Sequence, residues 1–261
     1  MLLQVLPPKN YVVSDFLFDI FMIAVCYIYV FMMILIPVAL KKKDKISKFT
    51  ARKMVHLFAG LVVLFVPFFI WPIYAIFIAL SLTLLVYFSS KESSVKQLRE
   101  LYESIGEEAE EKRGRLMGPL YYCISITILI SVFVFLAPDQ LYFPIAGILI
   151  MIIADTLASV VGKNWGRIKI KLPWTSTRTL LGSATMFGSA FLLCLGSFWC
   201  FGILMPLTQK PLTWNIIILY SFITALLATI IELISPSTLD DLTVPIGTTI
   251  IIYLLTLIYY L

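Results

Sequence analysis

Residues 148–187 read ILIMIIADTLASVVGKNWGRIKIKLPWTSTRTLLGSATMF, in which a polar segment separates two apolar segments. Asp155 lies inside the first apolar segment, where an ionised carboxylate is costly and is therefore a candidate functional group. Ser159 and Gly162 follow it by four and seven residues, so a helix places all three on one face. A carboxylate, glycines and a row of cations at a membrane surface suggest a site for a magnesium nucleotide.

The composition is that of a polytopic membrane protein. Of the 261 residues, 61% are apolar and only 13% are charged, far outside the usage of soluble globular proteins. Because a membrane-spanning helix needs roughly 20 apolar residues, we predict an all-α fold with about eight transmembrane helices, in a range of seven to nine, within a single integral membrane domain (residues 1–261). The predicted spans are residues 16–40, 54–70, 72–89, 119–137, 141–162, 181–205, 213–234 and 245–261.

Lysine and arginine residues are distributed unevenly among the predicted loops. If the spans alternate, 18 of the 20 cations fall on one side, and the other side holds Lys9 and Lys210. Basic loops stay cytoplasmic, so both termini, including the outer segment 1–15, are predicted to lie outside or in the lumen. The membrane would be the endoplasmic reticulum in a eukaryote and the plasma membrane in a prokaryote. The basic side carries the loops 41–53, 90–118, 163–180 and 235–244.

The longest polar segment, residues 91–118, predicts an amphipathic helix on the cytoplasmic surface. Val95, Leu98 and Ile105 recur at helical spacing among charged residues. The acidic run that follows is interpreted as a solvated face, which is the usual role of such a run. It consists of Glu107, Glu108, Glu110 and Glu111.

The polar segment 163–180 is predicted to form the nucleotide loop. RIKIKL at residues 167–172 alternates polar and apolar residues, so it is expected to form a short strand and, with TSTRT at residues 175–179, a small hairpin. A helix follows, and backbone N–H groups at its start, near Gly182 and Ser183, suit phosphate oxygens.

Arg52, Lys53 and His56 stand at the entrance of the second predicted span. Arg52, His56 and Gly60 recur every four residues and therefore share a helical face. From spacing alone, a structural role for this single histidine is favoured over a catalytic one, and Gly60 would let another helix approach closely.

Three carboxylates lie near the cytoplasmic end of the seventh predicted span: Glu232, Asp240 and Asp241. An N-terminal cap of the last helix is the simplest explanation of Asp241. An acidic cluster on the same predicted side as Asp155 also suits Mg²⁺ that bridges phosphates. No phosphate-binding motif of soluble nucleotide-binding proteins is present, and the short juxtamembrane basic loops argue against nucleic acid as a partner.

Four segments in this order resemble the CTP-dependent polyprenol kinase family, which includes dolichol kinases, phytol and farnesol kinases, and CTP-dependent diacylglycerol kinases. Each motif alone is weak, but the ordered set is specific. The segments are RKMVHLFAG (52–60), ADTLASVVGKNWG (154–166), TRTLLGS (177–183) and ELISPSTLDDLTVP (232–245). The chain departs from the family pattern at Arg178, where lysine is usual, at Leu181, where many members have glutamate, and at Asp241-Leu242 in place of an Asp-Asn pair.

The resemblance implies an integral membrane kinase that moves the γ-phosphate of CTP to a lipid hydroxyl and depends on Mg²⁺. Asp155 would be a magnesium or catalytic carboxylate, and the base that accepts the hydroxyl proton would be Asp155, Asp240, Glu232 or His56. The implied metal ligands are Asp155, Asp240 and Asp241. The implied nucleotide-binding residues are Arg52, Lys53, Ser159, Gly162, Lys163, Gly166, Lys169, Arg178, Thr179, Gly182 and Ser183.

The acceptor is expected to be a lipid alcohol whose tail stays in the bilayer. A dolichol, polyprenol or shorter isoprenoid alcohol is the first choice and diacylglycerol the second. The alternatives are a cytidylyltransferase that makes a CDP-lipid from CTP and a non-enzymatic lipid transporter or scramblase. A homodimer is also left open by the sequence.

Overall fold

The computed structural model describes residues 7–106, 110, 114–175, 177–236 and 239–259. The chain divides into two compact units, Met1–Phe135 and Leu136–Leu261, and each is described here by itself. Within the described residues, seven helical segments are long and apolar enough to cross a membrane, and Ile73–Phe88 is a shorter apolar helix. The predicted all-helical, multi-pass fold is therefore confirmed.

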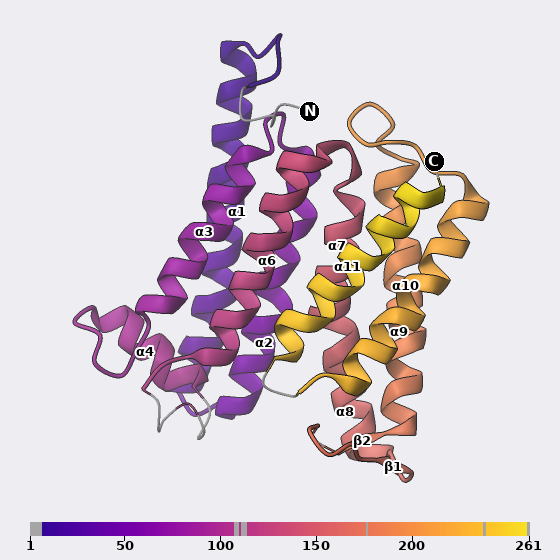
Figure 1. Cartoon of the computed structure of the whole chain (residues 1–261). Coiled ribbons are helices and arrows are strands. Elements are labelled where there is room, and N and C mark those ends of the chain that lie inside the picture. Colours follow the sequence, from indigo (N-terminus) through magenta and orange to yellow (C-terminus); the bar gives the residue numbers. More distant parts are fainter. Residues whose placement is uncertain (1–6, 107–109, 111–113, 176, 237–238, 260–261) are drawn as a thin grey trace. The chain divides into compact units, whose positions relative to one another are not determined.

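The first unit is built of helices joined by short connections (Figure 1). Ser47 caps the second helix, because its hydroxyl oxygen accepts the Thr50 N–H at 3.1 Å. The elements are α1 (Val13–Lys42), α2 (Lys48–Gly60), η1 (Leu61–Phe68), α3 (Ile73–Phe88), α4 (Lys96–Ile105) and α6 (Met117–Leu136).

The tight connection between η1 and α3 is held by a buried carboxylate. Asp19 of α1 is completely buried and accepts the backbone N–H groups of Ile70 at 2.9 Å and Trp71 at 3.1 Å, and the Tyr11 hydroxyl at 2.8 Å. These bonds satisfy the carboxylate where its desolvation would otherwise be costly. Asp19 was not predicted from the sequence, although it carries the same signal as Asp155, an acid within an apolar segment.

The segment 91–118 contains the predicted amphipathic helix, α4. Its apolar residues Leu101, Tyr102 and Ile105 are buried, and they form a core cluster with Val38 of α1 and Ala51 of α2. The apolar face of α4 is therefore covered by neighbouring helices of its own unit.

The second unit contains residues 148–187, the segment with Asp155 and the predicted nucleotide loop. Its elements are η2 (Pro138–Gln140), α7 (Tyr142–Leu149), η3 (Ile150–Ala154), α8 (Asp155–Trp165), β1 (Lys169–Ile170), β2 (Arg178–Thr179), α9 (Leu180–Gly202), α10 (Trp214–Ile234) and α11 (Asp240–Tyr259). The predicted hairpin is present: β1 and β2 pair antiparallel, with Lys169 opposite Thr179 and Ile170 opposite Arg178. Figure 1 shows this hairpin at the ends of α8 and α9.

The central helix of the second unit is α7, which continues through the π-helical segment η3 into α8. Every residue of α7 is buried, and the helix contacts both α9 and α11. A helix that is apolar on all sides must be surrounded by other elements. This central position carries Asp155, the first residue of α8, to one end of the unit.

Two predicted boundaries are wrong by a few residues. Lys163 lies in the last turn of α8, which continues to Trp165, so the helix takes up the first part of the predicted loop 163–180. The last helix begins at Asp240 rather than at Pro245, and the proline lies inside it. Helical structure extends beyond the apolar runs because polar residues can complete helix ends at a membrane surface.

Candidate active site

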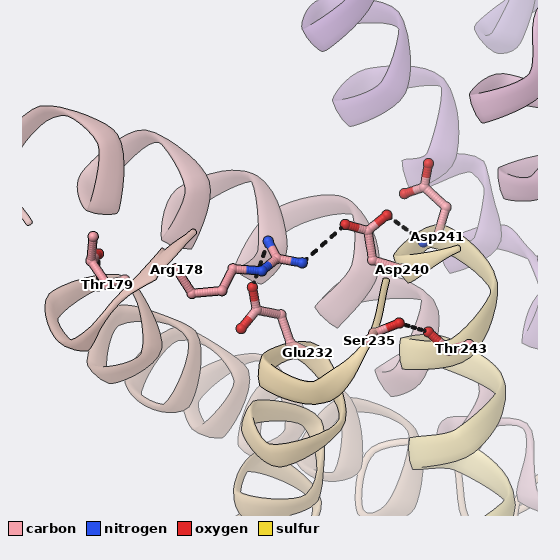
Figure 2. Close-up of polar contacts among 8 residues, drawn as sticks. Arg178, Thr179, Glu232, Ser235, Asp240, Asp241 and Thr243 are labelled. Atoms are coloured by element: carbon pink, nitrogen blue, oxygen red, sulfur yellow. Dashed lines mark hydrogen bonds and ion pairs between the residues drawn. The ribbon is translucent and has the colours of Figure 1, made fainter. Parts of the chain in front are cut away.

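Arg178 links three segments of the second unit that are far apart in sequence (Figure 2). Its guanidinium, carried by β2, places Nη1 2.8 Å from Glu232 Oε1 and Nη2 3.3 Å from Asp240 Oδ2. Glu232 belongs to the end of α10 and Asp240 to the start of α11. All three side chains are largely buried, with exposed fractions of 14% for Arg178, 5% for Glu232 and 17% for Asp240. The basic loop and the late acidic segment therefore meet.

Asp155 adds a third carboxylate to this cluster. It lies close enough to Glu232 for the two acids to interact electrostatically. The π-helical segment η3 directly precedes Asp155, and such segments occur frequently at functional sites because they interrupt the regular helical register. The sequence pattern identified Asp155 but gave no signal for the π-helical segment.

The cluster contains three carboxylates and one guanidinium. In their ionised forms, the guanidinium and the carboxylates of Asp155, Glu232 and Asp240 have a formal charge of −2. Unbalanced charge is costly in a partly buried site, so a divalent cation would stabilise this arrangement.

Carboxylates are the groups of this cluster that could hold a magnesium ion. Carboxylate oxygens are the ligands Mg²⁺ prefers, and Mg²⁺ usually takes one or two carboxylates together with water and phosphate oxygens. In the described part of the chain, no three His, Cys, Asp or Glu side chains form a metal-binding group. Metal binding by Asp155 and Asp240 therefore stays a prediction.

The late acidic segment is ordered by its own polar contacts. The Asp240 carboxylate accepts the Asp241 N–H at 3.1 Å, and the hydroxyls of Ser235 and Thr243 are hydrogen-bonded to each other. Figure 2 shows the Asp241 side chain directed away from Arg178. The two aspartates therefore have different surroundings, and Asp240 is the one that joins the Arg178 cluster.

The glycines of the predicted nucleotide loop surround Thr179, which joins β2 to α9. Thr179 Oγ1 accepts the Gly182 N–H at 3.1 Å and so caps α9. A Cβ atom at Gly162 would lie 2.7 Å from Thr179 Oγ1, and one at Gly166 would lie 2.4 Å from both that atom and the Gly162 carbonyl oxygen. These glycines allow α8, the hairpin and α9 to pack closely, and their predicted contact with nucleotide stays a prediction.

Three buried polar atoms around the cluster have no hydrogen-bond partner within the described residues: Thr156 Oγ1, Arg178 Nε and Ser183 Oγ. Buried polar atoms are nearly always hydrogen-bonded, so such atoms indicate where a polar ligand binds. Thr156 was missed in the sequence, although it directly follows Asp155. Ser183 lies in the first turn of α9, where it was predicted to contact phosphate.

The exposed predicted residues lie around this buried cluster. Ser159 and Lys163 are exposed on α8, and Lys169 is exposed on β1. The hairpin is attached to the end of α10 by Trp174, whose Nε1–H donates to the Ile234 carbonyl oxygen at 3.0 Å. Lys169 therefore lies on the same hairpin as Arg178, and Lys163 lies in the last turn of α8, the helix that precedes this hairpin.

The entry residues Arg52, Lys53 and His56 belong to α2 of the first unit. Arg52 Nη1 lies 2.6 Å from Glu110 Oε2, and the Glu110 side chain is only 8% exposed. The prediction of a solvated acidic run is therefore wrong for Glu110, which is buried because Arg52 neutralises it. The rest of that run, Glu107, Glu108 and Glu111, lies outside the described residues. Convergence of Arg52, Lys53 and His56 with the Arg178 cluster stays a prediction.

No family model and no solved structure matches the chain. Three plant proteins are similar over most of its length. The probable phytol kinase 2, chloroplastic, of Glycine max is 28% identical over 218 residues, which cover 83% of this chain and 68% of the relative. The probable phytol kinase, chloroplastic, of Triticum aestivum is 29% identical over 232 residues, which cover 83% and 71%.

The probable phytol kinase 1, chloroplastic, of Oryza sativa subsp. japonica is 31% identical over 221 residues, which cover 78% of this chain and 64% of the relative. This chain thus spans about two thirds of the length of these relatives. The resemblance carried by the four motifs is confirmed, because the chain is a multi-pass membrane protein that is similar to probable phytol kinases over most of its length.

Proposed function

We propose that this protein is a membrane lipid kinase that transfers the γ-phosphate of CTP to the hydroxyl of an isoprenoid alcohol. The observation that carries the proposal is the Arg178 cluster, in which one guanidinium pairs with Glu232 and Asp240 while Asp155 lies close enough to Glu232 to interact with it electrostatically. The names of the relatives favour an acceptor of about the size of phytol over dolichol or diacylglycerol.

Arg178 is suited to bind phosphate while it stays in place. A guanidinium has five N–H donors, and the two ion pairs use one nitrogen each, Nη1 and Nη2. The buried Nε has no partner within the described residues, so it has a donor available for a phosphate oxygen. Glu232 and Asp240 orient the guanidinium, and the exposed Lys163 and Lys169 add positive charge nearby.

Phosphoryl transfer depends mainly on positioning and on neutralising charge at the transferred group. Mg²⁺, when bound with the nucleotide, supplies the Lewis acidity that neutralises the phosphates, and Asp155 and Asp240 are the side chains that would hold it. Glu232, the most buried acid of the cluster, is assigned to hold Arg178. Asp155 is also our first choice to accept the hydroxyl proton, with His56 as the alternative.

The surface beside the cluster suits an acceptor that arrives from the bilayer. Leu157 and Val160 on α8 and Leu180 and Leu181 at the start of α9 are large apolar side chains that are 37% to 52% exposed. In a membrane these side chains contact lipid tails, so an isoprenoid chain can lie along them with its hydroxyl near Asp155. Leu181, at the position where many family members have glutamate, makes this surface more apolar.

The test is a kinase assay on protein purified in lipid nanodiscs with Mg²⁺. Each of the four nucleoside triphosphates, labelled at the γ-phosphate, is offered with phytol, farnesol, dolichol and diacylglycerol. We expect a labelled lipid phosphate with CTP and an isoprenoid alcohol, together with CDP. Release of pyrophosphate and a CDP-lipid would instead establish the cytidylyltransferase, and nucleotide-independent lipid flux without phosphate transfer would establish a transporter.

The same assay tests the orientation. We propose that the site faces the cytoplasm, because the cations concentrate in the loops that carry it. In sealed vesicles of known orientation, CTP added on the side of those loops should be used, and CTP added only on the opposite side should not.

A further inference from the structure

The start of α6 faces α2 in register within the first unit. Arg52 and His56 are one helical turn apart on α2, and Gly118 and Tyr122 are one turn apart on α6. The His56 and Tyr122 rings lie 4.4 Å apart between centroids, and the Tyr122 hydroxyl donates to the His56 carbonyl oxygen at 2.9 Å. The face of α2 that carries Arg52 and His56 is therefore directed toward the start of α6.

Glu110 completes this contact at the level of Arg52. Its Oε2 lies 2.6 Å from Arg52 Nη1, and its Oε1 accepts the Gly118 N–H at 2.8 Å. The carboxylate thus binds the first turn of α6, where N–H groups lack helical partners and negative charge is favoured. The Glu110 side chain, 58 positions from Arg52 in sequence, fixes the guanidinium of α2 against the N-terminus of α6.

Gly118 provides the space for this arrangement. A Cβ atom at this position would lie 2.3 Å from Arg52 Nη2 and 3.4 Å from Glu110 Oε1. The nearest atom, Arg52 Nη2, is at the end of a flexible side chain. Alanine at position 118 would therefore displace the guanidinium without a large shift of the backbone.

We propose that Glu110 is a positioning residue for the lipid kinase: it fixes the Arg52 guanidinium, and through it the α2 face that carries His56, in the orientation that the reaction needs. The inference rests on the proposed function and on the family resemblance, which implies that Arg52 binds nucleotide and that His56 is a candidate base. Glu110 itself does not touch the substrate; it acts through Arg52.

The chain offers a matched control for this ion pair. Lys42 Nζ lies 2.6 Å from Glu100 Oε2, the same separation as in the Arg52–Glu110 pair, but Lys42 is 46% exposed and Glu100 is 25% exposed. Exposed ion pairs contribute little, because water already solvates both partners. Glu100→Gln therefore removes a carboxylate from the same segment without disturbing Arg52.

The experiment compares Glu110→Gln, Gly118→Ala, the double variant and Glu100→Gln in nanodiscs. For each we measure the thermal midpoint and, well below it, kcat and KM for CTP per folded enzyme. We expect Glu110→Gln and Gly118→Ala each to raise KM or lower kcat by about tenfold, since a small misplacement of a site residue has effects of this order. The double variant should be little worse than either single one, because both act on Arg52.

The possible results distinguish failure of the inference from failure of the proposed function. If the wild-type enzyme is active and Glu110→Gln and Gly118→Ala have wild-type kcat and KM per folded enzyme, the inference is overturned, even if their thermal midpoints fall. If Glu100→Gln has the same kinetic defect, the effect is not specific to Arg52 and the inference is overturned as well. If the wild-type protein phosphorylates no lipid alcohol, the proposed function fails instead.

Discussion

Two buried arginines, one in each unit, are paired with acids in different ways. Arg52 pairs with Glu110, whose carboxylate also accepts the backbone N–H of Gly118 at the start of α6. Arg178 pairs with two carboxylates, Glu232 and Asp240, with Asp155 nearby, so acids are in excess. The Arg52–Glu110 pair joins one cation to one acid and connects two helices of the first unit. A cluster with excess negative charge is stabilised by a cation, which is what a magnesium nucleotide would bring.

The strongest test of this difference removes a charge from the acidic cluster. Asp155→Asn should lower kcat by about a thousandfold, the upper range for losing one group that stabilises the transition state. Because like charges repel, the thermal midpoint should stay the same or rise. Activity near the wild-type value would remove Asp155 from the mechanism, and a parallel His56→Asn variant shows whether the alternative base carries the proton transfer.

Replacement of Arg178 tests whether both of its carboxylate partners matter. Lysine offers a single charged nitrogen and cannot bind two carboxylates with a planar fork, so Arg178→Lys should lower kcat/KM by about a hundredfold. Arg178→Gln should in addition destabilise the fold by about 3 kcal/mol, because it leaves buried carboxylates without a counter-charge. Denaturant unfolding and kinetics measure the two effects. Full activity of Arg178→Lys would show that simultaneous binding of two carboxylates by the guanidinium is not needed.

The close packing around Thr179 is tested by two glycine-to-alanine substitutions, one at a crowded position and one at an open position. Gly166→Ala puts a Cβ atom 2.4 Å from a backbone carbonyl oxygen and from Thr179 Oγ1, so the hairpin must shift at a cost of about 2 kcal/mol. Gly196→Ala on α9 meets nothing within 4 Å and should be neutral or slightly stabilising, since alanine favours helix. Equal thermal midpoints for the two variants would contradict the packing described here.

The smallest expected effect on stability concerns the exposed Lys42–Glu100 ion pair of the first unit. Lys42 donates a hydrogen bond to Glu100 and lowers the pKa of that carboxyl below its ordinary value. A lowered pKa in the folded state stabilises the fold above the unfolded-state pKa, and this contribution is lost as the pH falls through the folded-state pKa. The difference in thermal midpoint between wild type and Glu100→Gln should be barely measurable at neutral pH and should vanish in acid. A large difference at pH 7 would mean that the pair is more important than its exposure implies.

The sequence predicted what is periodic or local. Apolar runs predicted the spanning helices, alternation predicted the β1–β2 hairpin, and the acid in an apolar run identified Asp155. The ordered motifs placed Arg178, Glu232 and Asp240 in one hypothesis, and the structure brings these three side chains together.

The remaining features depend on contacts between distant residues. Arg52 and Glu110 are 58 positions apart, and nothing local distinguishes Glu110 from the solvated acids expected around it. Likewise, Asp19 receives N–H groups from a turn more than 50 positions away. The roles of Gly118 and Gly166 follow from which atoms surround them in space, which spacing along the chain cannot indicate.

The most direct test of the central claim is the product formed from γ-labelled CTP and phytol by the purified wild-type protein and by Asp155→Asn. We predict that the wild-type protein transfers the label to the alcohol and releases CDP, and that the Asp155→Asn protein, equally folded, does not. A label found only in pyrophosphate, or equal transfer by both proteins, would contradict it.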